Sequence, residues 1–149
     1  MFNFFRKKRK ERIDMLLDTL DERSVNGVAA TAKTLMAQLM LSSYRHNYVD
    51  LLKSTFVRGY LFGYFDAAIQ RMQLPCQSEN DALFRIIAGH YFLFYDQKID
   101  VIEYVQNSID LQFDSEYKQA HELGVKELFG MYDNDERPLS LMQYIVEQK

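Results

Sequence analysis

The chain has few of the residues that interrupt helices or cross-link segments. Its 149 residues include one cysteine, two prolines, six glycines and no tryptophan. The single Cys76 excludes an internal disulfide and gives no cysteine spacing for a metal, which is typical of a reducing compartment. So few prolines and glycines predict long uninterrupted elements. We therefore expect a cytoplasmic protein.

Long apolar runs are also missing. A helix that crosses a membrane needs about 18 or more consecutive apolar residues, but the best candidate, residues 48–70, contains four charged side chains. A secretory signal places its charges before a longer apolar core, whereas here three phenylalanines precede a basic run. The sequence therefore predicts neither a membrane-spanning helix nor a signal peptide.

What is present is helical periodicity along almost the whole chain. Hydrophobic residues make up 48% and charged residues 26%, as in ordinary soluble globular proteins. No segment sustains the alternation with a period of two that is typical of strands. We expect an all-α, single-domain bundle of six or seven helices spanning 13–149, preceded by a basic leader at 1–12. The expected helices cover about 13–24, 28–44, 48–72, a fourth that begins after Ser78 or Asn80 and runs to Phe94, 97–111, a sixth that begins after Asp114 or Ser115, and 138–146.

The segment GYLFGYFDAA, residues 59–68, is expected to lie at the centre of the bundle, within a long buried helix over about 48–72. Its helix would present apolar side chains in all directions, which is typical of a buried helix. Gly59 and Gly63 are four residues apart and would let a neighbouring backbone approach closely. Asp66 is then predicted to be buried, and a buried carboxylate needs a hydrogen-bonding or charged partner. The candidate partners are Arg58, Arg85, His90 and several tyrosines.

Asp66 and His90 allow two interpretations. His90 interrupts the apolar stripe of another predicted helix, so the pair would be two polar groups of the core that fix the packing register. Alternatively, two titratable groups with different environments would form the acid and base of an enzyme. The first interpretation is favoured, because perturbed polar groups also occur in purely structural networks.

Several motifs begin but are incomplete. HELG at 121–124 lacks the second histidine of a zinc protease, because position 125 is valine. DNDERP at 133–138 lacks the glycine and the glutamate of a calcium loop. No glycine loop for phosphate and no G-x-S-x-G turn is present. The sequence therefore predicts no catalytic site, no metal site and no cofactor.

The basic leader contrasts with the rest of the chain. Residues 1–12 carry a net charge of +5, and the remaining 137 residues carry −8. A segment with cations and aromatic rings is typical of a contact with an anionic membrane surface, although a frayed, solvated terminus is an equally open interpretation. The acidic body makes nucleic acid an unlikely partner. The candidate membrane or anion contacts are Phe2, Phe4, Phe5, Arg6, Lys7, Lys8, Arg9 and Lys10.

The helix predicted at 97–111 has acids at a regular spacing. Six polar side chains, five of them acidic, are separated by 4, 3, 4, 3 and 4 residues, the spacing of one continuous helical face. Such a face is either a solvated surface or a docking surface for a basic partner. The six residues are Asp96, Asp100, Glu103, Asn107, Asp110 and Asp114.

One stretch resembles a known family. GYLFGYFDA, residues 59–67, is similar to a G-Y-x-x-G-x-x-D-A stretch of small helical immunity proteins that neutralise secreted bacterial toxins. The likeness covers nine of 149 residues, so it assigns neither a family nor a residue role.

The sequence thus favours a cytoplasmic, non-enzymatic protein-binding module that resembles an inhibitor, an immunity protein or an adaptor. It would dock a protein with a basic surface through its acidic helix face. The alternatives are a peripheral protein of the inner membrane face, anchored by the leader, and an enzyme that uses Asp66 and His90. The sequence does not indicate an oligomeric state.

Overall fold

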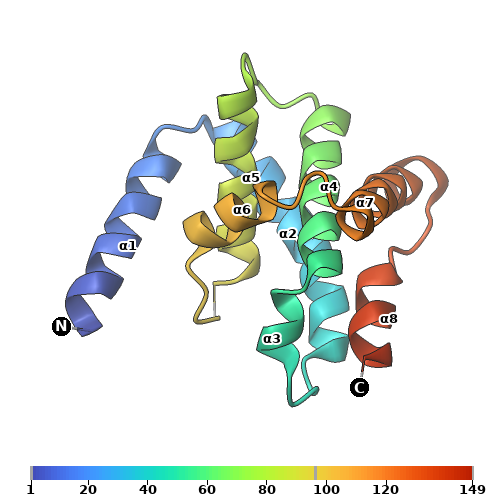
Figure 1. The fold of residues 1–149 in the computed structure, drawn as a ribbon. Helices are drawn as coiled ribbons and strands as arrows, with labels where there is room; N and C mark the ends of the chain where they lie inside the picture. The colour runs from blue at the N-terminus through green and yellow to red at the C-terminus, as the bar shows by residue number, and fades with distance from the viewer. Residues whose placement is uncertain (1, 96, 149) are drawn as a thin grey trace.

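The computed structural model describes residues 2–95 and 97–148, with the backbone alone for residues 2–6 and 9. These residues form eight helices and no strand, packed into one compact body (Figure 1). Seven of the helices have seven or more residues. The helices are α1 (Phe2–Asp18), α2 (Glu22–Ser42), α3 (Tyr48–Leu52), α4 (Thr55–Arg71), α5 (Glu79–Leu93), α6 (Val101–Ile109), α7 (Ser115–Asn134) and α8 (Ser140–Glu147).

The all-α prediction is confirmed, but the predicted central helix at 48–72 is wrong in one respect. The chain breaks between α3 and α4 because Ser54 takes an extended conformation, and its hydroxyl accepts a hydrogen bond from the Val57 amide at 3.4 Å. A serine with this geometry is an N-cap, which starts a new helix. The centre of the bundle is therefore α4 alone.

The first two helices also differ from the prediction. α1 begins at Phe2, so the basic leader is part of the first helix. α2 begins at Glu22, so Asn26 and Gly27 lie within a helix. The start of α2 is set by Asp21, whose carboxylate accepts from the Ser24 amide at 2.9 Å. An aspartate three residues before a serine satisfies a first-turn amide, and this signal outweighs the weak helix propensity of Asn and Gly.

α4 is the most enclosed helix of the bundle, and nine of the eleven residues 59–69 are buried. Figure 1 shows it in the middle, between α7 on one side and α2 and α5 on the other. The backbones of α7 and α4 are in direct contact, because Gly59 and Gly63 face the backbone of Tyr117 and His121 with no side chain between them. Gly124 of α7 faces the Tyr60 carbonyl in return. The expectation of a close backbone approach at these glycines is confirmed.

A polar network attaches α8 to this pair. Tyr60 donates its hydroxyl proton to Glu127 of α7 at 2.7 Å, and Gln38 of α2 donates to Tyr60 at 3.1 Å. Glu127 also accepts from the Ser140 backbone amide at 3.1 Å and from the Ser140 hydroxyl. Since Leu139 supplies no side-chain cap, Glu127 caps the first turn of α8 from another helix. Helices α4, α7 and α8 thus meet at one carboxylate, and α2 joins the network through the bond from Gln38 to Tyr60.

The glycine contacts predict opposite effects for two matched substitutions. A Cβ at position 63 would collide with the backbone of α7, which cannot move without separating the helices, so Gly63→Ala should destabilise the fold by about 1–3 kcal/mol. A Cβ at position 130 meets only the end of the flexible Glu136 side chain. Gly130→Ala should be neutral or stabilise by about 0.5–1 kcal/mol through helix propensity. Urea unfolding of both variants measures the difference, and equal stabilities would contradict the close contact.

Candidate functional site

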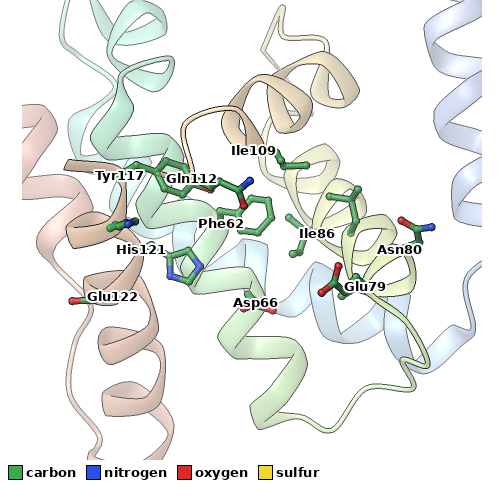
Figure 2. A pocket seen from close by; sticks show the side chains of 13 residues that line it. Phe62, Asp66, Glu79, Asn80, Ile86, Ile109, Gln112, Tyr117, His121 and Glu122 are labelled. Carbon is green, nitrogen blue, oxygen red and sulfur yellow. The ribbon is translucent and has the colours of Figure 1, made fainter. Parts of the chain in front are cut away.

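A cleft of about 570 Å³ opens where α4, α5, α6 and α7 meet (Figure 2). Its apolar lining comes from four helices, with Phe62 from α4, Leu83 and Ile86 from α5, and Ile109 from α6. The aromatic side is completed by α7, where the Tyr117 ring lies 6.5 Å from the Phe62 ring. The close approach of α4 and α7 fixes this wall of the cleft.

Carboxylates from three helices lie around the apolar lining. They are Asp66 on α4, Glu79 on α5 and Glu122 on α7. Figure 2 shows Asp66 and Glu79 both below Phe62 and Ile86, and Glu122 farther away beyond His121. Among the described lining residues, Lys118 is the one lysine or arginine. The cleft therefore combines an apolar interior with a net negative rim.

Asp66 is half-buried and faces this cleft, so the prediction of a core carboxylate is wrong. Its side chain accepts a hydrogen bond from Gln70, one turn later on α4, at 3.4 Å. The predicted arginine partners are used elsewhere, since Arg58 donates to backbone carbonyls and Arg85 pairs with Asp21 at 3.1 Å. Asp66 follows Gly63 by three residues, so it lies on the same side of α4 as the two glycines, at the position where that side lines the cleft.

The charge of Asp66 acts on the phenol of Tyr117, another residue of the cleft lining. Burial raises the pKa of the Tyr117 phenol, and the negative charge of Asp66 raises it further. Phe62, Tyr117 and His121 form a cluster of rings, with the His121 ring 6.2 Å from Phe62 and 6.3 Å from Tyr117. HELG at 121–124, which fails as a metal motif, thus places its histidine in the cleft.

His90 is sealed in the core and does not share a site with Asp66. Its side chain is fully buried, and its ring lies 5.0 Å from Phe65 and 5.6 Å from Tyr104. Nδ1 lies 2.8 Å from the Ile86 carbonyl, which only accepts, so Nδ1 carries the proton. Nε2 is buried and has no hydrogen-bond partner. The expectation of a buried polar His90 is confirmed. Asp66 lines the cleft and His90 does not, so the two side chains do not share one site.

The six-residue acidic face is not one helical face. α6 spans only nine residues, and Asp100 precedes it as N-cap, with its carboxylate 3.3 Å from the Glu103 amide. Asp110 follows α6, and Asp114 caps α7 by accepting from the Tyr117 amide at 3.1 Å. Asp96 lies outside the described residues. An aspartate at an N-cap satisfies an amide of the first turn, so two of these acids have a structural role.

Glu103 and the capping Asp100 line a surface that also contains cations. A second cleft of about 240 Å³ contains Asp100, Glu103 and Asn107 together with Lys53, Arg58 and Lys98. The Arg58 guanidinium lies 4.2 Å from the centre of the Tyr104 ring and donates to the Tyr104 carbonyl at 2.8 Å. This mixed charge differs from the uniform acidic face that the sequence predicts.

The leader is helical from Phe2 onward, and those of its side chains that the structure describes are exposed. Lys7, Lys8 and Lys10 are exposed, and α1 packs chiefly against α5, with Ile13 buried (Figure 1). The side chains of Phe2, Phe4, Phe5, Arg6 and Arg9 lie outside the described part of the structure. No described helix is long and apolar enough to cross a membrane.

Metal ligands do not gather in the described residues: no group of three or more histidine, cysteine, aspartate or glutamate side chains has suitable geometry. Cys76 is exposed on the loop before α5, and its thiol donates to the Ser78 carbonyl at 3.4 Å.

Sequence reasoning missed the cleft, because its lining comes from four helices whose packing is not encoded in local spacing. It also missed the Arg85–Asp21 pair, which ties the turn before α2 to α5. A signal for the pair was available at one end, since Asp21 occupies an N-cap position before an apolar helix. Comparison with protein families, with characterised proteins and with solved structures finds no match for this chain.

Because His90 is buried, we expect protonation of its imidazole to account for part of the stability that the protein loses in acid. Burial lowers the pKa of His90 to about 4 from an ordinary value of 6.5, so between these values the unfolded chain binds the proton and the folded chain does not. The stability that the neutral imidazole provides is present above pH 6.5 and is lost as the pH falls toward 4, with a slope of up to roughly 1.4 kcal/mol per pH unit.

The measurement is the free energy of unfolding of the wild type and of His90→Phe between pH 7 and 4. Phenylalanine keeps a ring in the core and cannot titrate, so the wild type should lose more stability than the variant over this window. Parallel curves would show that His90 does not contribute.

Proposed function

We propose that this chain is a non-enzymatic binding module that docks a basic segment of a partner protein in the cleft between α4, α5, α6 and α7. The observation that carries the proposal is the composition of the cleft, which has an apolar interior and carboxylates from three separate helices at its rim. Lysine and arginine side chains match this arrangement, since their aliphatic stems pack on apolar surface while the charged heads reach the rim.

Electrostatics supports the same partner chemistry. The chain after residue 12 carries a net charge of −8, so a basic segment is attracted before contact. A concave surface of one sign focuses the field, which speeds association. The acids of the α6–α7 turn, Asp110 and Asp114, are exposed and flank Gln112 of the cleft, so they extend the negative surface.

The proposed docking surface is the cleft and not the helical face that the sequence predicts. Asp100 caps α6, and Glu103 lies beside cations, so these two acids attract a basic partner less than the cleft does. The exposed Phe113, with 79% of its surface accessible, follows Gln112 of the cleft lining in the α6–α7 turn and offers an additional apolar contact.

The test is an amide chemical-shift titration with two synthetic ten-residue peptides, one alternating lysine and leucine and the other alternating glutamate and leucine. The basic peptide should shift amides of 79–86, 109–122 and Asp66 in a saturable and salt-sensitive manner. The acidic peptide should not shift them. Shifts spread evenly over the surface would contradict a specific cleft.

Neutralising the rim should weaken the complex of the basic peptide at least about tenfold, which corresponds to roughly 1.4 kcal/mol. A matched triple substitution removes three exposed carboxylates elsewhere and should change the affinity little. The rim variant is Asp66→Asn, Glu79→Gln, Glu122→Gln, and the control variant is Glu22→Gln, Glu136→Gln, Glu147→Gln. Equal affinities of the two variants would refute the cleft as the docking site.

A second candidate function is contact with an anionic membrane surface through α1, favoured by the exposed cations Lys7, Lys8, Lys10 and Arg12. Each contributes about 1 kcal/mol near such a surface. The protein should then sediment with vesicles of phosphatidylserine and phosphatidylcholine but not with phosphatidylcholine alone. A variant with glutamate at positions 7, 8 and 10 should stay in the supernatant, and co-sedimentation of this variant would contradict the contact.

A further inference from the structure

The C-terminal half of α2 has an apolar face that the described helices leave in solvent. Met40 is 74% exposed, Leu41 62% and Tyr44 69%, and Ala37 is exposed beside them. We call these four residues the α2 stripe. Tyr44 lies two residues after the end of α2 at Ser42, and the intervening Ser43 keeps right-handed backbone angles (φ −69°, ψ −11°) that continue the turn of the helix.

The spacing of the stripe is that of a helix-packing surface. Positions 37, 40, 41 and 44 follow the pattern i, i+3, i+4, i+7, which places four side chains on one side of a helix. The opposite side of α2 already packs in the core, where Leu35, Leu39 and Ser42 are buried. The stripe is therefore a second apolar face of the same helix, and exposed faces of this kind mark interaction sites.

The absence of charge on the stripe restricts the chemistry of its partner. Residues 34–44 contain no charged side chain, so the stripe offers nothing to a basic or an acidic ligand. It differs in this respect from the cleft and from α1, and it lies outside the cleft lining. The α2 stripe therefore matches a partner surface that is itself an uncharged, apolar helix face.

We propose that the stripe binds the α2 stripe of a second copy of this chain, with the two helices antiparallel about a two-fold axis between Met40 and Leu41. In that arrangement Ala37 of one copy lies opposite Tyr44 of the other, so a small side chain accommodates a large one. Met40 lies opposite Leu41. An isologous contact repeats every charge across the axis, and a charge-free stripe avoids that repulsion.

The available area sets the strength of the contact. Three large side chains with more than 60% of their surface exposed are available for burial. They offer on the order of 400 Å² per copy, so two copies bury up to about 800–900 Å², the size of a weak or transient interface. We therefore expect a dimer that forms in the micromolar range and is independent of the cleft.

Sedimentation velocity of the full chain from about 5 to 500 µM tests the proposal. The wild type should shift from monomer to dimer over this range. Leu41→Glu should weaken association at least about 100-fold, because it places two like charges beside the axis. Phe113→Glu is the matched control, since it makes the same kind of change at an exposed residue outside the stripe, and it should dimerise like the wild type.

Cysteine cross-linking in a Cys76→Ser background tests the orientation. A mixture of Ala37→Cys and Tyr44→Cys chains should form disulfide-linked dimers under a mild oxidant more readily than either chain alone. Preferred Ala37→Cys self-pairs would contradict the antiparallel arrangement. A chain that stays monomeric at 500 µM, or association that Leu41→Glu leaves unchanged, overturns the proposal. So does a monomer whose stripe binds phosphatidylcholine vesicles, because lipid is then its occupant.

Discussion

The structure depends on the contact between the backbones of α4 and α7. Gly59 and Gly63 on one helix and Gly124 on the other remove the side chains that would hold the two helices apart. Helices usually pack at interaxial distances of about 8–10 Å that their side chains set, so glycines at the crossing allow the closest approach. This approach puts Tyr60 within reach of Glu127, which in turn caps α8.

The same contact shapes the candidate site. α7 packs against α4 at the glycines, and the adjoining surface of α4 lines the cleft toward α5 and α6 with Asp66 and Phe62. The cleft is thus a consequence of how the core packs. The α2 stripe lies on a different element and is independent of it, so a dimer through α2 would present two clefts. Two linked clefts would bind a partner with two basic segments more tightly than one cleft.

Much of the fold could be predicted from the sequence, because the decisive signals are local. The apolar surroundings of Gly59 and Gly63 indicate a central helix, and serine or aspartate before an apolar run indicates where a helix begins. Ser78 and Asp114 cap α5 and α7 as these signals predict. Ser54 gives the same signal inside the predicted helix 48–72, and there the apolar pattern on both sides concealed the break.

The site was harder to predict because it depends on long-range packing. The acids between positions 96 and 114 have the spacing of a helical face, but the same spacing results when aspartates cap the ends of successive short helices. Asp66 appeared buried because α4 is apolar around its circumference, and only the placement of α7 and α5 decides which side of α4 faces a cleft. His90 was assigned to the core correctly, since it interrupts the apolar stripe of α5.

Native-state hydrogen exchange tests most directly whether α4 and α7 form one rigid unit whose backbones are in contact. Amides of buried helices that unfold together exchange with one shared free energy. We predict that amides of residues 59–69 and 120–130 are the slowest in the chain and share the free energy of global unfolding. Exchange of 120–130 at a distinctly lower free energy than 59–69 would contradict the claim, because α7 would then open separately from α4.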